Sequence, residues 1–185
     1  MENARLSTEQ ELEAALASIR AAPRDAGVVE LIVRRPDRGE REVLAQATLD
    51  PALGLVGDNW HARPARGRAD GSPDLERQIT VMGARAVAAV AGDRARWPLA
   101  GDQLYVDLDL GRENLPAGTE LVVGTAVIAV SAAPHPGCDK FTARFGSAAA
   151  RWVNTPAGRA LNLRGINARI VTGGVVRPGD AIRKR

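Results

Sequence analysis

The sequence predicts a mainly β fold with few helices, built as a closed barrel or a sandwich. Two observations carry this prediction. Many short segments rich in Val, Ile and Leu are separated by Gly, Asp or Pro, as in folds made of many short strands. Helical patterns are too few to lie between all successive strands, as a parallel α/β fold would require.

The first element that the pattern predicts is an amphipathic helix over residues 8–22. Thr8 and Glu11 have the spacing of a capping box, which satisfies free backbone N–H groups at a helix start. Pro23 then ends the helix. Its apolar face is narrow and consists of Leu12, Ala15, Leu16 and Ile19. We therefore expect residues 1–24 to form an accessory helix that packs on a main domain of residues 25–185.

Strand candidates occupy most of the remaining chain. They are residues 27–33, 43–49, 77–82, 103–110, 120–124, 126–132, 167–173 and 180–185. The first two are expected to pair through the polar hairpin connection between them. Helices are expected only at residues 83–92, 139–153 and 155–161. The longest segment without a pattern is 63–76, and such loops tend to be mobile or to cover a site.

Composition narrows the class of protein. A chain of 185 residues fits one compact domain with an appendage. Its net charge of +3 comes more from arginine than from lysine, which favours an anionic ligand, although a GC-rich genome produces the same usage. One cysteine excludes an internal disulfide and sites with several cysteines, such as iron–sulfur clusters.

The composition also bears on where the protein is located and which partners it binds. No apolar run reaches membrane-spanning length, and the first residues lack the apolar centre of a signal peptide. We therefore expect a cytoplasmic protein without a membrane partner. Few aromatic residues are present to stack on bases, and the positive charge is not gathered in a stripe, so nucleic-acid binding is the weakest function class.

The single cysteine, Cys138, lies in the segment "APHPGCDKFTARFG". A Pro-Gly pair precedes it, so it is expected where the chain turns after a strand. Lys140 and Arg144 follow within about a helical turn, and cations favour the thiolate, which is a nucleophile, a sulfur carrier or a ligand for soft metals. A lone cysteine is equally often a small buried apolar residue. A zinc site with His61, His135 and a carboxylate has no spacing pattern to support it.

Three other segments carry polar residues at expected turns. "LGLVGDNWHAR" places Asp58 and His61 after a glycine turn, which suits either close approach to a ligand or a plain hairpin. "LGRENL" presents Arg112 and Asn114 between two strand candidates, and "NLRGINARIV" presents Arg164 at the head of a strand. Each arginine taken alone is also consistent with solvated surface.

Taken in order, five segments resemble the MOSC family, the domain named for the C-terminal part of molybdenum cofactor sulfurase. They are "GLVGDNWH", "RQITVM", "GRENLPAGTELVVGTAVIAV", "CDKFTARFG" and "RGINARIVTGGVVRPGD". The resemblance implies a MOSC-type closed or partly open β-barrel and leaves the N-terminal helix outside it. Gly137 departs from the family pattern, in which Pro or Arg is commoner before the cysteine.

The resemblance also implies a function. Cys138 falls on the key cysteine, which ligates the molybdenum of the molybdenum cofactor (molybdopterin) in relatives that reduce N-hydroxylated compounds. Such an oxidoreductase would need an external reductase. The alternative is a sulfur carrier that receives sulfur on Cys138 from a pyridoxal-phosphate-dependent cysteine desulfurase, without turnover of its own. The residues implied to bind the cofactor are Asp58, His61, Arg112, Asn114, Lys140, Arg144 and Arg164.

From these positions we expect Arg112, Asn114 and Arg164 to converge with Cys138 on one pocket. A guanidinium takes two phosphate oxygens at once, and the asparagine amide offers both donor and acceptor atoms.

Overall fold

The fold is a mixed β-barrel, described by a computed structural model over residues 5–62 and 70–185. Within these residues seven strands close the barrel, and the last pairs back to the first. In spatial order they are β1 (Ala26–Arg34), β6 (Leu104–Asp107), β5 (Ile79–Gly83), β9 (Ile166–Thr172), β8 (Ala126–Val130), β7 (Glu120–Val123) and β11 (Ala181–Lys184). Neighbouring strands are antiparallel except β5 and β6, which are parallel. The predicted barrel is thus confirmed.

A second, smaller sheet corrects the predicted hairpin. Only β2 (Glu42–Val43) pairs with β1, and the chain then leaves the barrel edge. β3 (Ala47–Asp50) pairs instead with β10 (Gly174–Val176) and β4 (Gly54–Leu55). In this position Ala47 and Leu49 reach the barrel core, and this burial favours the break.

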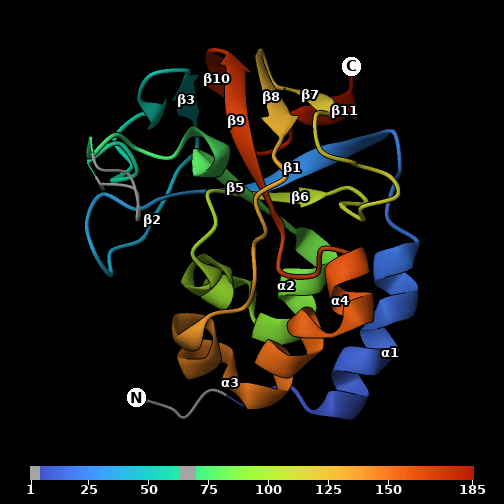
Figure 1. The fold of residues 1–185 in the computed structure, drawn as a ribbon. Coiled ribbons are helices and arrows are strands. Elements are labelled where there is room, and N and C mark those ends of the chain that lie inside the picture. Colours follow the sequence, from blue (N-terminus) through green and yellow to red (C-terminus); the bar gives the residue numbers. More distant parts are fainter. Residues whose placement is uncertain (1–4, 63–69) are drawn as a thin grey trace.

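The helices gather on one side of the barrel, in the lower half of Figure 1. They are α1 (Glu9–Arg20), α2 (Ala84–Ala91), α3 (Asp139–Asn154) and α4 (Pro156–Ala160), with 3₁₀ turns η1 (Leu75–Arg77) and η2 (Arg94–Ala100). The predicted capping box of Thr8 and Glu11 is present at the start of α1. α3 is kinked at Gly146, whose φ of 84° suits glycine, and a side chain there would meet Leu6.

Side chains alternate between the two faces of each strand, and this alternation produces two apolar cores. Along β5 and β6, Val81 and Leu104 point into the barrel, whereas Met82 and Tyr105 point outward under the helices. The outer core also contains Leu12 of α1, which is fully buried. The N-terminal helix thus contributes to a core, and the division of the chain at residue 25 stays a prediction.

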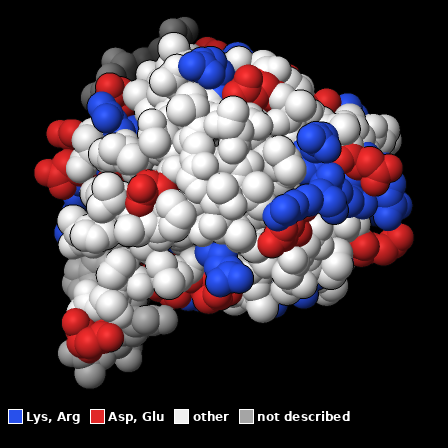
Figure 2. Space-filling model, turned by 90° about the horizontal axis from the view of Figure 1, so that it is seen from above, with Lys and Arg blue, Asp and Glu red and all other residues white. Residues whose placement is uncertain are grey.

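The end of the barrel away from the helices carries no strong charge. Figure 2 shows uncharged residues in the middle of this face and charged side chains of both signs toward its edge. None of the helices in the described residues combines the length and apolar composition needed to cross a bilayer. Residues 63–69 of the loop expected at 63–76 lie outside the described residues.

Candidate functional site

Cys138 lies on the surface, between β8 and α3. Its side chain is exposed, so it is not a small apolar residue of the core. The preceding Gly137 is held from both sides by Asn154: the Gly137 N–H donates to Asn154 Oδ1 and Asn154 Nδ2 donates to the Gly137 carbonyl, each at 3.1 Å. A Cβ at position 137 would stand 2.8 Å from Val153 Cγ2. Close packing therefore favours glycine at this position.

The thiol faces a cavity of about 640 Å³, which we call the Cys138 cavity. Its lining is strongly positive. The charged residues and the cysteine of its wall are Arg35, Asp37, Arg38, Arg41, Cys138, Lys140, Arg144 and Arg164. One carboxylate thus faces six cations among the described lining residues, an arrangement that favours anionic ligands.

Arg164 forms the inner wall of this cavity through a buried ion pair. Its Nη1 lies 2.6 Å from Oδ2 of Asp102, and its Nη2 donates to the Ala100 carbonyl at 2.9 Å. The guanidinium lies 5.0 Å from the ring centre of Phe141. Both charged side chains are nearly fully buried, at 8% and 0% exposure. Both Nη atoms of Arg164 are therefore engaged within the protein, and Nε has no hydrogen-bond partner among the residues that the structure describes.

His135 completes this inner wall. Its Nδ1 stands 3.6 Å from Asp102 Oδ1, beyond hydrogen-bond length, and neither atom has another partner. Burial lowers the pKa of His135 well below its usual value, and the positive charges of Arg164 and Arg35 act in the same direction. Burial also raises the pKa of Asp102, against the opposing effect of Arg164. The imidazole is therefore neutral at neutral pH, and Asp102 Oδ1, His135 Nδ1 and Arg164 Nε are buried without a hydrogen-bond partner among the described residues.

Asp58 acts on the cavity through Arg35. Its fully buried carboxylate accepts from Arg35 Nε at 2.8 Å and from Nη2 at 2.9 Å, while Arg35 Nη1 donates to the Gly101 carbonyl. Asp58 therefore fixes the orientation of Arg35 and has no contact with the cavity. His61 is exposed beside Trp60 and is not among the described residues that line the cavity.

The cationic side chains of the Cys138 cavity differ in whether they already have hydrogen-bond or ion-pair partners within the protein. Arg35 and Arg164 are paired as described, and Arg144 Nη1 donates to the Leu99 carbonyl at 2.6 Å. Within the part of the chain that the structure describes, the side chains of Arg38 and Lys140 have no hydrogen-bond or ion-pair partner. These two are the side chains most available to an anionic ligand.

The expected convergence of four residues on one pocket is met in part. Cys138 and Arg164 share the cavity together with Lys140 and Arg144. Arg112 lines neighbouring cavities, one of which, about 270 Å³ in volume, it shares with His135 and Arg164.

Asn114 does not reach the Cys138 cavity and is buried. Its Nδ2 donates to the carbonyls of Arg24 and Asp109 at 2.8 Å, and its Oδ1 accepts from Lys184 Nζ at 2.6 Å. Both ends of the Asn114 amide are occupied within the protein, and this leaves it little to offer a ligand.

Sequence reasoning missed part of the wall. The segment 34–41, "RRPDRGER", was assigned to a polar turn, yet it supplies Arg35, Arg38 and Arg41. The signal that could have identified this segment is its four arginines within eight residues, next to a strand. Asp102 stands in a Gly-Asp pair, which is typical of a turn and does not indicate a buried ion pair. No group of three His, Cys, Asp or Glu side chains in the described residues is placed to hold a metal, so the zinc alternative is not formed there.

Comparison with known proteins identifies relatives of this fold. The sequence model described as "MOSC domain" matches residues 66–183, which include Cys138, Lys140, Arg144 and Arg164 but not Arg35 or Asp58. A comparison with curated proteins gave no match.

Solved structures share the fold at low identity. The YuaD protein from Bacillus subtilis superposes with a TM-score of 0.61 at 18% identity, over 85% of this chain and 94% of that one. YiiM from Escherichia coli gives 0.56 at 18% identity, over 85% and 69%. YiiM from Geobacillus stearothermophilus gives 0.55 at 15% identity, over 89% and 74%.

Proposed function

Because the chain belongs to the MOSC domain family, we propose that it binds the molybdenum cofactor with Cys138 as the metal ligand and reduces N-hydroxylated compounds. The observation that carries this proposal is the exposed thiol beside a cavity with six cations and one carboxylate in its wall. A buried cysteine in an apolar surrounding would have argued against it.

The residues present fit such a group. A thiolate is a ligand of the kind that suits molybdenum bound to sulfur, and the partnerless side chains of Arg38 and Lys140 can bind the phosphate of the pterin. Arg164 Nε is a buried donor without a partner on the same wall. When bound, the cofactor supplies the two-electron redox chemistry.

The proposed reduction takes two electrons and two protons, breaks the N–O bond and releases water. The electrons come from an external reductase, because one cysteine cannot hold an iron–sulfur cluster. In the protein, Cys138 holds the metal, and the cations bind the anionic part of the cofactor. His135 lines the cavity as a neutral imidazole, which has one donor and one acceptor nitrogen, and its Nδ1 lies 3.6 Å from Asp102 Oδ1.

The exposure of Cys138 also favours a second candidate, a sulfur carrier. A thiol on the surface is accessible to the active site of a pyridoxal-phosphate-dependent cysteine desulfurase. In that case Cys138 accepts a sulfur atom as a persulfide and passes it on, and the chain turns over no substrate itself.

One experiment tests both. Wild type and Cys138→Ser are purified from a host that makes the cofactor and from one that does not, and molybdenum and persulfide are measured. We expect Cys138→Ser to abolish retention of the metal or the persulfide while the thermal midpoint stays within about a degree, because an exposed thiol contributes little packing.

Reductive turnover of an N-hydroxylated compound with a chemical electron donor then separates the enzyme from the carrier. Equal molybdenum and persulfide content in wild type and Cys138→Ser would reject both functions.

A further inference from the structure

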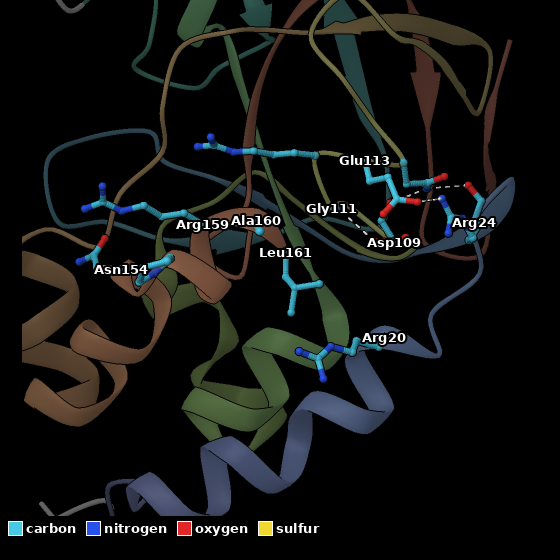
Figure 3. A pocket seen from close by; sticks show the side chains of 12 residues that line it. Arg20, Arg24, Asp109, Gly111, Glu113, Asn154, Arg159, Ala160 and Leu161 are labelled. Atoms are coloured by element: carbon cyan, nitrogen blue, oxygen red, sulfur yellow. Dashed lines mark hydrogen bonds and ion pairs between the residues drawn. The ribbon is translucent and has the colours of Figure 1, made fainter.

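A second cavity, of about 820 Å³, lies beside α4, and we call it the arginine cavity. It is formed where the end of α1, the connection from β6 to β7, and α4 meet (Figure 3). Its charged lining residues are Arg20, Arg24, Asp109, Arg112, Glu113 and Arg159. Four arginines therefore face two carboxylates.

Only one of the four arginines has an acidic partner. Arg24 Nη2 stands 3.4 Å from Glu113 Oε1, and Asp109 Oδ1 accepts from the Gly111 N–H. The side chains of Arg20, Arg112 and Arg159 have no hydrogen-bond or ion-pair partner among the described residues. These three side chains line one cavity, and each guanidinium has five N–H donors to offer an anionic ligand.

Backbone hydrogen bonds fix the positions of these arginines. The Arg112 N–H donates to the carbonyl of Ala160, the residue after Arg159, at 2.9 Å, so the two arginines are held side by side. Asn114 Nδ2 donates to the Arg24 carbonyl at 2.8 Å and ties the end of the α1 connection to the same turn. The elements that form the site are already ordered in the folded protein, so a ligand has little further ordering to impose, and this favours binding.

The arginine cavity adjoins the Cys138 cavity. Asn154 lines the arginine cavity and holds Gly137, the residue before Cys138. The cavity of about 270 Å³ between the two is lined by Arg112 and Arg159 on one side and by His135 and Arg164 on the other. A ligand at the three arginines therefore lies against the segment that carries the thiol.

We propose that the arginine cavity binds the phosphate group of a phosphorylated small molecule. A phosphate carries up to two negative charges and presents several oxygens, which suits three guanidinium forks better than a single carboxylate does. The phosphate belongs either to a separate metabolite or to a ligand whose other end lies at Cys138. Binding of a separate metabolite does not depend on the proposed function, because none of the three arginines lines the Cys138 cavity. A ligand anchored at Cys138 rests on the proposed function, and its phosphate would then lie at the arginine cavity instead of at Arg38 and Lys140.

The first arm of the test uses protein from a host without the molybdenum cofactor, titrated with inorganic phosphate and pyrophosphate at low salt in a calorimeter. We expect pyrophosphate to bind, and Arg112→Ala and Arg159→Ala each to weaken it about ten- to a hundredfold. Arg20→Ala tests the part played by α1. Arg177→Ala removes the same charge from an exposed turn that lines neither cavity, and it should bind like wild type.

The second arm separates the two sources of the phosphate. In protein from a cofactor-making host, loss of molybdenum from the Arg112→Ala/Arg159→Ala double variant assigns the phosphate to a ligand anchored at Cys138. Unchanged molybdenum assigns it to a separate metabolite. Failure of the proposed function would leave wild type without molybdenum yet still binding pyrophosphate. Equal pyrophosphate binding by wild type, the double variant and Arg177→Ala would overturn the inference, whatever the molybdenum content.

Discussion

The two cavities use arginine in opposite ways. In the Cys138 cavity, Arg35 and Arg164 are paired with the buried carboxylates of Asp58 and Asp102. In the arginine cavity, Arg20, Arg112 and Arg159 are exposed and have no protein partner in the described residues. Buried ion pairs thus form the inner wall of the Cys138 cavity and leave Arg38 and Lys140 as its available donors, whereas three of the four arginines of the arginine cavity are available to a ligand.

Burial explains the difference. Taking a guanidinium out of water is unfavourable by several kcal/mol unless a carboxylate and further acceptors compensate, so a buried arginine needs a partner inside the protein. An exposed arginine keeps its water and needs none. The residue type alone therefore does not identify a binding residue, whereas burial together with partners does.

The largest effect is expected from breaking the buried pair. Asp102→Ala leaves the Arg164 charge buried without a carboxylate, and we expect a loss of about 3–5 kcal/mol in the free energy of unfolding, measured in urea. Asp37→Ala makes the same chemical change at an exposed position of the same cavity and should stay within about 0.5 kcal/mol. A loss below about 1 kcal/mol for Asp102→Ala would remove the distinction between the two cavities.

A loss of stability of intermediate size is expected from replacing Asn114. Asn114→Ala removes the donor to the carbonyls of Arg24 and Asp109 and one acceptor of the Lys184 ammonium, which keeps its ion pair with Asp25, and we expect the free energy of unfolding to fall by about 1–3 kcal/mol. Molybdenum retained at Cys138 should not change, because the side chain does not reach that cavity. Unchanged stability together with lost molybdenum would return Asn114 to the cofactor site.

The barrel could be predicted because its signal is local. Alternation along β5 and β6 places Val81 and Leu104 on one face and Met82 and Tyr105 on the other, and the capping box of α1 joins two residues only three positions apart. The pairing of β3 with β10 could not be predicted from the sequence, because it depends on burial of Leu49 beside a strand more than a hundred residues away.

The residues of the candidate site also differ in whether the sequence alone could predict their roles. The cysteine and its cations, Lys140 and Arg144, are near in sequence and could be found there. The partners that decide the roles of the other residues are distant: Asn114 bonds to residues 90 and 70 positions away, and Arg164 pairs with Asp102 across 62 positions. Such polar pairs leave no periodic pattern, so Asn114 resembled a ligand-binding residue and Asp102 resembled a turn.

The smallest effect concerns pH and tests whether the inner wall of the Cys138 cavity is as buried as its geometry indicates. The pKa of His135 in the folded protein lies well below 6.5, because of burial and the nearby Arg164 and Arg35, whereas in the unfolded chain it is about 6.5. As pH falls below about 6.5, the unfolded chain takes up a proton that the folded protein does not. Stability therefore decreases toward acid, by at most about 1.4 kcal/mol per pH unit.

Asp102 acts with the opposite sign, since burial raises its pKa in the folded state and its contribution to stability is lost as pH rises through that value. The His135 contribution is isolated by urea unfolding of wild type and His135→Asn between pH 7.5 and 5. We expect a constant difference between the two above pH 7 and a growing advantage for His135→Asn below pH 6.5, because asparagine takes up no proton. Parallel curves over this range would mean that the imidazole titrates alike in both states, and the neutral His135 beside Asp102 would have to be given up.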